Sequence, residues 1–556
     1  MYRNKTARQH NFATVPRSDI PRSKFRMRQT RKQAFNASDL IPIMCEEVLP
    51  GDTWSHEENI VARFATPIAP AVDDINLETW YFFVPNRITW DEKQWEEFIS
   101  GVGEVQRVIP RITPLNTDEP PTRVIPVNSL FDHFGIPPGD YTRASPPGPF
   151  LFNVLPIWAY FRIWNEWFRD QNLQPEWYWI PGWTDDVSTA IMEAGDDTPW
   201  NMQCLRVNKV HDYFTSSLPW PQKGDPVTMP LGTTAPVIPE ELGVSAPNFV
   251  DGMVSGITLV GSATAATEWS IPVGDGNTPT WGSSGLVADL SAATAATINA
   301  LRLAAQTQKL LEQDARGGSR YVEQILVHFG VRSPDYRLDR PEYLGGSKIA
   351  VNVNPVAQTA AYDAEPGDTA SAVGNLGAEM HASGSKRTFS YAATEHGYII
   401  GLAAVRSTPT YQQGIRRHWV GRNTRLDYYF PVFANLGEQA VATEEIFLAG
   451  DGIYTNETWG YQERNAEYRY TPNEITGVMR SQVAQPMDWW HYAEEFGDEP
   501  ALNGEFITDK TQETLARSLA TAPSAQWSAQ IIMDVLHDST VARLMPAYGV
   551  PGIDRF

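Results

Sequence analysis

Short, strand-like apolar runs separated by long connections are the feature that most constrains the fold. Residues 76–84 read NLETWYFFV, and near the end of this run the apolar side chains fall on both alternating faces. That pattern is typical of a strand buried between two layers. Similar runs occur at residues 396–405, 424–433, 444–450 and 527–537. Because these runs lie far apart in the sequence, they favour a β-sandwich with large insertions over a compact barrel.

The composition fits a loop-rich globular chain with a large core. The 556 residues include 19 Trp, 21 Tyr and 23 Phe, together with 42 Pro and 40 Gly. Aromatic side chains bury large areas in cores and interfaces. A chain of this length is long enough for several ordinary domains, but an insertion-rich all-β fold can take it up in one unit.

Neither a membrane span nor a disulfide framework is expected. The sequence has no run of about 18 apolar residues, and its basic, polar beginning lacks the apolar region of a secretory signal. The two cysteines, Cys45 and Cys204, form no C-x-x-C pattern. Such sparse cysteines suit a chain assembled in a reducing cytoplasm.

A helix is expected over residues 156–175, which read PIWAYFRIWNEWFRDQNLQP. Pro156 suits the first helical position, and Pro175 marks the stop. Between them, apolar and mainly aromatic side chains recur at helical spacing and form a stripe on one face of the helix. Such a stripe is more often core or subunit interface than a cofactor site. The residues that fall at helical spacing on this face are Ile157, Tyr160, Phe161, Trp164, Trp167 and Phe168.

A turn between two helices is expected within residues 312–324, EQDARGGSRYVEQ. Thr297 can cap the first helix and Ser319 the second. Gly317 and Gly318 suit the turn, because Gly readily takes the left-handed conformation after a helix. A phosphate loop is disfavoured, since no strand precedes the Gly pair and no Lys follows in P-loop register. A DNA-reading helix-turn-helix is also disfavoured, since the second helix shows mainly apolar and acidic groups.

Residues 224–301 contain seven acids and no Lys or Arg. The tract is rich in Gly, Ala, Ser and Thr, which indicates an exposed, loop-rich insertion rather than core. A disordered linker is the alternative, but Val, Ile, Leu and Trp recur throughout the tract.

The net charge of −22 is unevenly distributed. Residues 1–33 hold ten basic residues and one acid, a net charge of +9, whereas the remaining 34 basic and 65 acidic residues give −31. A basic arm on an acidic body indicates contact with nucleic acid or another acidic partner, although a solvated tail or a strap across a neighbouring subunit is about equally consistent. The basic residues of the arm are Arg3, Lys5, Arg8, Arg17, Arg22, Lys24, Arg26, Arg28, Arg31 and Lys32.

A second basic and aromatic cluster lies in GIRRHWVGRNTR, residues 414–425. Arg416, Arg417 and Trp419 are candidates for holding single-stranded nucleic acid, because phosphates bind Arg and bases stack on rings. A strand edge or a subunit interface is the stronger alternative for this cluster.

Motifs for catalysis are missing from the sequence. It contains no P-loop, no G-x-G-x-x-G, no intact G-x-S-x-G and no H-E-x-x-H, and its ten histidines show no metal-ligand spacing. We therefore expect no enzyme activity, no cofactor and no metal. The main alternative is a β-rich glycan-processing enzyme, which needs two carboxylates flanking a Trp-lined cleft. A sequence-specific DNA-binding regulator is disfavoured by the acidic body.

Four long motifs resemble the major capsid protein of gokushovirus-type microviruses. They are IWNEWFRDQNLQ (163–174), KVHDYFTSSLPWPQKGDPV (209–227), EQDARGGSRYVEQILVHFGVRSPDYRLDRPEYLGG (312–346) and YQERNAEYRYTPNEITGVMRS (461–481). The basic segment RSKFRMRQTRKQAFNASDLIPI and the tail MPAYGVPGIDRF are also similar to that family. The motifs are long, in family order and spread over the whole chain.

The resemblance implies a mainly β fold, an eight-stranded viral jelly roll (antiparallel β-sandwich) with long loop insertions and a few helices. It divides the chain into a basic arm over residues 1–40 and one jelly-roll capsid domain over residues 41–556. About 60 copies would form a T = 1 icosahedral shell around circular single-stranded DNA. The expected setting is the virion capsid, assembled in the cytoplasm of a bacterial host.

The resemblance also implies further partners. Residues 224–300 correspond to the family's variable insertion, which builds a protrusion at the threefold axes and is proposed to meet a host surface receptor. No residue motif carries over there, so the receptor candidates rest on location alone. Because the body is acidic, we also expect a small basic internal DNA-binding protein. The receptor candidates are Trp269, Asp275, Asn277 and Trp281.

Overall fold

The computed structural model divides the chain into two compact units, which are described separately. Unit 1 comprises Met1–Pro221 and Gly317–Phe556, and unit 2 comprises Gln222–Arg316. The structure describes residues 21–90, 92–100, 109–112, 124–140, 142–144, 147–149, 152–179, 192–194, 203–225, 227, 237–239, 249–251, 254–257, 280–281, 286–288, 298–318, 320–360, 373–448, 457–520 and 529–548.

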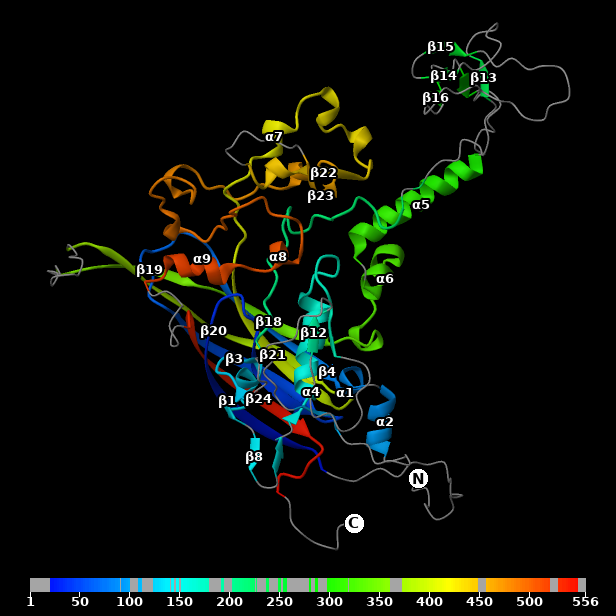
Figure 1. The fold of residues 1–556 in the computed structure, drawn as a ribbon. Helices are drawn as coiled ribbons and strands as arrows, with labels where there is room; N and C mark the ends of the chain where they lie inside the picture. Colours follow the sequence, from blue (N-terminus) through cyan, green and yellow to red (C-terminus); the bar gives the residue numbers. More distant parts are fainter. Residues whose placement is uncertain are drawn as a thin grey trace, which may run out of the picture. The chain divides into compact units, whose positions relative to one another are not determined.

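Two antiparallel sheets form the centre of unit 1 (Figure 1). Strand β24, near the end of the sequence, lies between β1 and β3, near its beginning. The five-stranded sheet has the order β1 (Ser23–Phe35), β24 (Ile531–Arg543), β3 (Thr53–Phe64), β20 (Leu376–Ala392) and β19 (Asn352–Ala357). The four-stranded sheet has the order β18 (Glu342–Ala350), β4 (Ile75–Pro85), β21 (Gly397–Ser407) and β2 (Ile41–Val48).

The order of these strands is that of a jelly roll. The first four strands alternate between the sheets, so β1 and β3 lie in one and β2 and β4 in the other. All neighbouring strands in both sheets are antiparallel. The predicted antiparallel β-sandwich is therefore confirmed. The count of eight is not, because the two sheets hold nine described strands, with β18 and β19 separated by a single residue.

Strand β4 shows why the sandwich has two separate apolar layers. Its side chains are buried on both faces, as the run NLETWYFFV predicts. Leu77, Tyr81 and Phe83 point into the core between the sheets. Phe82 and Val84 point the other way, into a second cluster under helix α4. A central strand covered on both sides loses the polar alternation of a surface strand.

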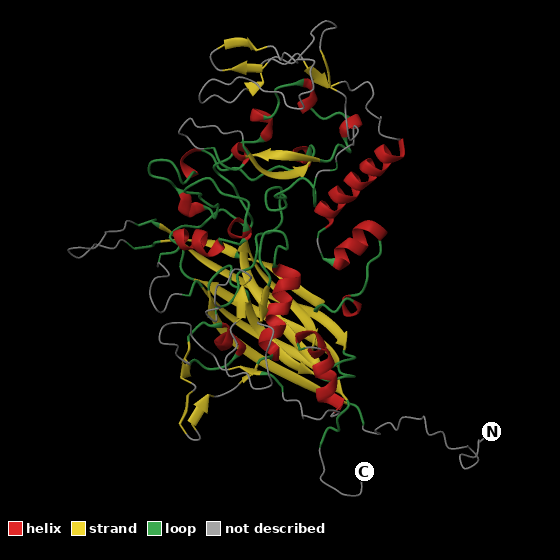
Figure 2. Cartoon of the chain, turned by 45° about the vertical axis from the view of Figure 1, so that its right-hand side comes forward, coloured by secondary structure: helices red, strands yellow, loops and turns green. Residues whose placement is uncertain are grey.

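Helix α4 (Leu155–Ile163) covers the outer face of the four-stranded sheet (Figure 2). Pro lies in its first turn, as predicted. The helix ends earlier than the predicted Pro175, because it widens into the π-helical turn η2 (Trp164–Phe168). The backbone N–H of Arg169 bonds the carbonyl of Trp164 there. The predicted aromatic stripe is core, since Tyr160, Phe161 and Trp164 are buried.

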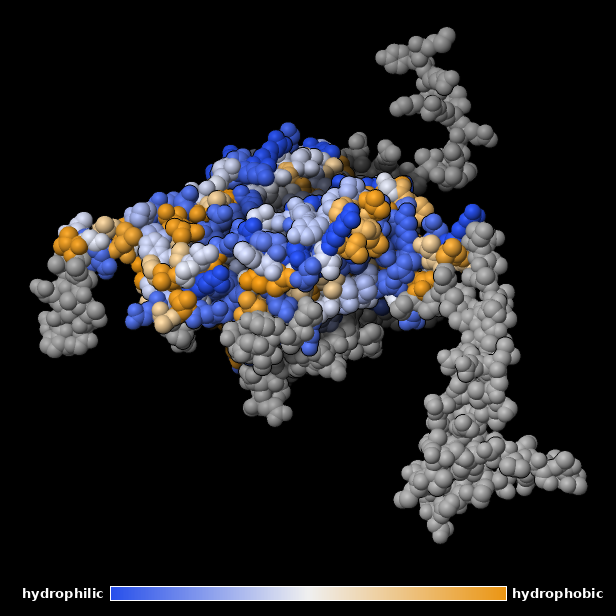
Figure 3. Space-filling model, turned by 90° about the horizontal axis from the view of Figure 1, so that it is seen from above, coloured by the Kyte–Doolittle hydropathy of each residue, from blue (hydrophilic) through white to orange (hydrophobic). Residues whose placement is uncertain are grey.

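Two of the predicted strands are wrong. Residues 424–433 form the 3-10 turns η5 (Arg425–Asp427) and η6 (Pro431–Phe433). The described part of 444–450 begins in another turn, η7 (Thr443–Glu445). Neither segment has a partner strand in the described sheets, and several apolar side chains of the first stay exposed. Figure 3 shows that apolar residues form separate patches on one face of the molecule.

The predicted helix pair is present. Helix α5 (Ile298–Gly317) is followed by α6 (Tyr321–Phe329), and Gly318 has φ +85°. A Cβ on Gly317 would lie 2.6 Å from Val327 Cγ2, so a larger residue is disfavoured. The backbone N–H of Arg320 donates to Glu323 Oε2 (3.3 Å) at the start of α6. The predicted caps Thr297 and Ser319 lie outside the described residues.

Shorter elements fill the connections. The other α-helices described are α1 (Asn86–Thr89), α2 (Glu92–Ser100), α3 (Leu130–Phe134), α7 (Arg417–Val420), α8 (Gly504–Ile507) and α9 (Thr511–Ser518). Small paired strands are β5 (Arg111–Ile112) with β10 (Phe152–Asn153), β6 (Val124–Ile125) with β7 (Gly139–Asp140), β8 (Thr142–Ala144) with β9 (Pro147–Pro149), β11 (Trp177–Trp179) with β12 (Met192–Ala194), and β22 (Glu438–Ala442) with β23 (Thr458–Glu463).

Two histidines form a buried polar chain inside the sandwich. His537 Nε2 donates to the carbonyl of Ile43 on the opposite sheet (2.9 Å), which leaves its Nδ1 as the acceptor facing His56 Nε2 (3.4 Å). His56 Nδ1 then accepts from the Ser539 hydroxyl (2.7 Å). The rings stack with centroids 5.3 Å apart. This arrangement needs both imidazoles neutral.

Burial lowers the pKa of both groups. The pKa of His56 falls to about 3, first through burial and then through His537, with Asp538 opposing. The pKa of His537 falls to about 4 through burial and Arg31, with the Ile43 hydrogen bond opposing. Stability from these groups is complete above the ordinary pKa of 6.5 and declines below it, because the unfolded chain takes up the protons first.

Lowering the pH from 7 to 5 should therefore reduce the free energy of unfolding by about 2 kcal/mol for each imidazole. His56→Phe keeps an aromatic ring beside Phe389 and Tyr81 while removing one titrating group. Urea unfolding at several pH values should show about half the histidine-dependent loss in this variant. An unchanged pH dependence would contradict the role of the pair.

Candidate nucleic-acid interface

The structure places much of the predicted basic arm in a sheet. Residues 23–35 form strand β1, which pairs with β24 along its whole length. The local reason is alternation: Phe25 and Met27 are partly buried on the inner side, whereas Arg26 and Arg28 are exposed. A strand with charged outward side chains suits a sheet edge.

Four basic side chains of β1 face solvent on the outer side of the five-stranded sheet. Arg26 Nε donates to Asp538 Oδ1 (2.9 Å), and Arg28 Nε lies 3.3 Å from Asp538 Oδ2. The Arg26 hydrogen bond is the main reason that the pKa of Asp538 lies below its ordinary value. Lys32 Nζ lies 3.3 Å from Asp534. The basic row comprises Lys24, Arg26, Arg28 and Lys32.

Two other predicted basic residues fix the sheet edge. Arg22 donates to the Thr53 hydroxyl (2.6 Å) and to the Ala542 carbonyl (3.3 Å). Arg31 is partly buried and donates to the backbone carbonyl of His133, and burial lowers the pKa of its guanidinium. Both side chains are thus engaged within the subunit. The remaining predicted arm residues, Arg3, Lys5, Arg8 and Arg17, lie outside the described residues.

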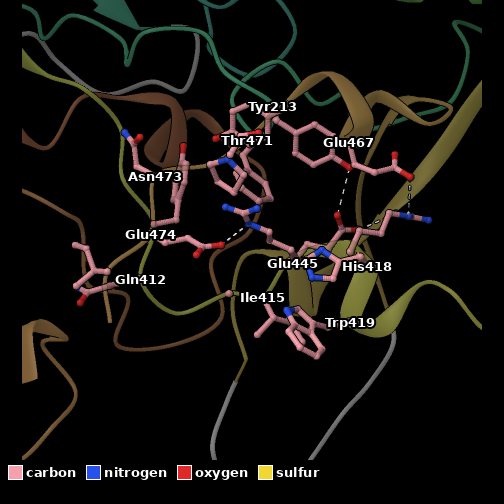
Figure 4. Close-up of a pocket in the computed structure, with 18 of the residues that line it drawn as sticks. Tyr213, Gln412, Ile415, His418, Trp419, Glu445, Glu467, Thr471, Asn473 and Glu474 are labelled. Carbon is pink, nitrogen blue, oxygen red and sulfur yellow. Dashed lines mark hydrogen bonds and ion pairs between the residues drawn. The ribbon is translucent and has the colours of Figure 1, made fainter. Parts of the chain in front are cut away.

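The second predicted cluster lines a pocket of about 430 Å³ (Figure 4). Arg416 precedes α7 and Arg417 begins it, and Trp419 lies in the same short helix. Trp419 is 75% exposed. The structure thus brings all three predicted residues together. Their surroundings, however, are acidic as well as aromatic.

Carboxylates neutralise the arginines of this pocket. Arg417 Nη1 bonds Glu445 Oε1 (2.7 Å) and Arg422 Nη2 bonds Glu467 Oε1 (2.7 Å). Glu467 also lies 3.9 Å from Arg417 Nε, so four charges alternate in sign along one wall. Burial raises the pKa of Glu445, while Arg417 opposes the rise.

The same neutralisation extends to the other side of the pocket. Arg416 pairs with Glu474. Guanidiniums held in this way are poorly disposed to take phosphates, because a phosphate would have to displace a carboxylate. The row on β1 also has ion pairs, but its cations are far more exposed: Arg26 and Lys32 are 65% and 74% exposed, against 10% for Arg422. Exposed pairs are weak, so the row is the better candidate for nucleic acid.

Sequence reasoning missed the partners that shape this pocket. Glu445 and Glu467 lie tens of residues from the arginine cluster, and no spacing connects them. Tyr213 comes from much farther away and stacks on Tyr470 with centroids 5.4 Å apart. Tyr213 also donates to Glu445 (3.3 Å). Only the folded chain reveals this arrangement.

Unit 2 contains the predicted receptor region. Its described strands are β13 (Val237–Pro239) paired with β17 (Leu286–Ala288), and β14 (Phe249–Asp251) between β15 (Val254–Ile257) and β16 (Thr280–Trp281). Trp281 thus lies in a strand. Trp269, Asp275 and Asn277 lie outside the described residues.

Within the described residues, no helix is both long and apolar enough to cross a bilayer. The same residues contain no group of three or more His, Cys, Asp or Glu side chains arranged to hold a metal ion.

Two antiparallel sheets with jelly-roll connections and long insertions place the chain among the jelly-roll proteins, a class that includes viral capsid subunits. The model of the family described as capsid protein (F protein) matches residues 13–553. The chain belongs to this capsid protein family and is a structural protein of the virion shell.

Relatives match over nearly the whole length of the chain. Capsid protein VP1 of Bdellovibrio phage phiMH2K is 40% identical, covering 98% of this chain and 97% of the relative. Capsid protein VP1 of Chlamydia phage 1 is 35% identical, covering 98% of each chain. Capsid protein VP1 of Spiroplasma virus 4 is 36% identical, covering 99% and 98%.

These relatives confirm the resemblance to gokushovirus-type major capsid proteins. Their names are those of structural proteins, which agrees with the expectation of a chain that is not an enzyme. The comparisons give no support to the glycan-processing alternative.

The charged wall of the pocket should contribute to stability. Glu467→Gln removes the carboxylate shared by Arg417 and Arg422, and should lower the free energy of unfolding by about 2 kcal/mol. Glu474→Gln is the matched control, because its half-exposed ion pair should contribute less than about 0.5 kcal/mol. Urea unfolding followed by tryptophan fluorescence checks both values. Equal effects would contradict the assignment.

Proposed function

We propose that about 60 copies of this chain form a T = 1 icosahedral shell around a circular single-stranded DNA genome. The observation that carries the proposal is the jelly roll together with the full-length match to the capsid family. Many weak contacts repeated by symmetry make such a shell stable. Assembly takes place in the cytoplasm of a bacterial host. An assembly reaction of purified chain should yield closed particles, visible by electron microscopy.

The outer face of the five-stranded sheet is the part of unit 1 that we assign to the genome. The opposite sheet buries its outer face under α4, whereas β1 presents Lys24, Arg26, Arg28 and Lys32 to solvent. Cations on an open surface take phosphates of any sequence. Phe25 and Phe35 point inward, so contact there relies on charge rather than stacking.

We also propose that a small basic internal protein binds the genome inside the shell. Residues 34–556 carry a net charge of −31, which repels a genome unless another cation source is present. The arm and the row on β1 supplement that protein. Deleting residues 1–33 is a poor test of the arm, because it removes most of β1 from the sheet.

Side-chain substitution tests the genome-facing row. Lys24→Gln with Lys32→Gln removes two cations from exposed positions of β1. We expect the slope of log affinity for single-stranded DNA against log salt to become shallower by about 1.4, and the particles to hold less DNA. Lys93→Gln with Arg469→Gln is the control, since both residues are exposed but outside the row and outside residues 414–425. An unchanged slope in the first variant would refute the interface.

Unit 2 is the part that we assign to host attachment. It is a separate compact unit whose sequence lacks basic residues from 224 to 301. A compact insertion can change to fit a receptor without disturbing the shell-forming sheets. The candidates Trp269, Asp275, Asn277 and Trp281 remain predictions from location.

Replacing residues 250–285 by a short Gly/Ser linker should abolish adsorption to host cells while particles still assemble. Deleting residues 361–372, which connect β19 and β20, is the control for shortening a connection elsewhere. Adsorption of labelled particles and particle yield are measured together. Normal adsorption by particles that lack residues 250–285 would contradict the assignment of unit 2 to receptor binding.

A further inference from the structure

Helix α6 and the segment after it expose an apolar strip. Tyr321 is 72% and Phe329 78% exposed, and no residue of the helix is buried. The strip continues through Val331 and Tyr336, which lies in the turn η4 (Asp335–Arg337). The apolar strip comprises Tyr321, Leu326, Phe329, Val331 and Tyr336. Large exposed apolar side chains gathered in this way mark contact sites.

The charges around the apolar strip are positive. Arg332 and Arg337 are exposed, and neither guanidinium has an ion-pair partner within the described residues. The acids beside them are engaged: Glu323 bonds Gln171 (2.6 Å), and Asp335 lies 3.3 Å from Arg340. A partner for this strip should therefore combine an apolar centre with negative charge.

A pocket elsewhere in unit 1 has those properties. It has a volume of about 710 Å³ and lies between the segment after Tyr492 and helix α9. Phe496, Pro500 and Phe506 supply apolar walls. Four exposed carboxylates surround them. Lys510 also lines the pocket and pairs with one of them, Glu505 (3.4 Å), whereas Arg517 donates to the carbonyl of Ala493 (2.6 Å). The carboxylates of this acidic pocket are Glu495, Asp498, Glu499 and Glu505.

We propose that the apolar strip of one copy docks into the acidic pocket of a second copy of this chain. Phe329 and Tyr336 fill the apolar walls, while Arg332 and Arg337 meet the carboxylates. The strip and pocket carry opposite charge, so each selects the other rather than itself. A strip-to-strip contact would set Arg332 and Arg337 against their own copies, which is unfavourable.

The positions of the two surfaces suit a head-to-tail contact. Helices α6 and α9 lie on opposite sides of unit 1 in two views (Figures 1 and 2). A contact between different surfaces of identical chains closes into a ring when its rotation is that of a symmetry axis. This inference rests on the proposed shell and adds the surfaces that join neighbouring subunits.

Charge exchange tests the contact. Arg332→Glu with Arg337→Glu should reduce the yield of assembled particles at least about tenfold, and so should Asp498→Lys with Glu499→Lys. Combining all four changes in one chain should restore most of the yield, because the reversed strip then meets a reversed pocket. Arg425→Glu, an exposed charge reversal outside both surfaces, should leave the yield unchanged. Circular dichroism and melting temperature establish that each variant folds.

A crosslink provides a second readout. Phe329→Cys with Pro500→Cys should give chain-to-chain disulfides in assembled particles. The native Cys45 and Cys204 are free, but burial raises the pKa of both thiols, which disfavours the reactive thiolate. Each single substitution should give no ladder of linked chains.

The outcomes separate the contact from the shell. Three results would overturn the contact and leave the shell standing. They are normal assembly of either doubly substituted chain, no recovery of yield when all four charge changes are combined, and assembled double-cysteine particles without the ladder. Failure of the unsubstituted chain to assemble would instead overturn the proposed shell. A linked dimer that never extends into a ladder would indicate a symmetric contact and also overturn the proposal.

Discussion

The pairing of β24 with both β1 and β3 is the constraint on which the rest of the fold depends. This strand comes from the end of the chain and lies between two strands from its beginning, so Arg26 reaches Asp538 across 512 positions. The five-stranded sheet is therefore incomplete until almost the whole chain is present. Pairing over such separations is slow, because loop-closure entropy is lost before the contacts form. Insertions are tolerated because their ends are fixed by strands already held in place.

The polar chain through His56 and His537 follows from the same arrangement. His537 belongs to β24, His56 to the adjacent β3, and the Ile43 carbonyl to the opposite sheet. Glu58 makes another such link, since it accepts hydrogen bonds from Tyr81 (2.7 Å) and Thr79 (3.0 Å) across the sandwich. Buried polar groups must be satisfied in one geometry, so these links fix how the two sheets face each other. Apolar packing alone would tolerate more variation.

The local sequence pattern predicted those elements whose apolar residues are in fact buried in the core. Strands β4 and β21 and helix α4 are surrounded by core, and their runs of apolar residues show it. Strand β24 buries one face only, and its apolar residues fall mainly on that face. Residues 424–433 have equal β propensity but no partner strand, so Tyr428 and Tyr429 remain exposed in turns. Strand β1 was not predicted, because its inward residues Phe25 and Met27 alternate with basic residues, and such a charged run is also typical of an exposed arm. The pocket wall of Glu445, Arg417 and Glu467 needed tertiary structure, since its members share no spacing.

Charge is arranged differently at each proposed surface, and this has a consequence for assembly. The row on β1 is partly neutralised by Asp534 and Asp538, so phosphates compete with carboxylates already in place. On the proposed contact, Arg332 and Arg337 of the apolar strip meet Asp498 and Glu499 of the acidic pocket only between subunits, since none of the four has an ion-pair partner among the described residues of its own chain. Salt weakens both kinds of contact, but exposed pairs are screened more than pairs closed off from water. Subunit contacts with an apolar centre should therefore outlast genome contacts as ionic strength rises. A shell built in this way can stay assembled at an ionic strength at which its affinity for the DNA has already fallen.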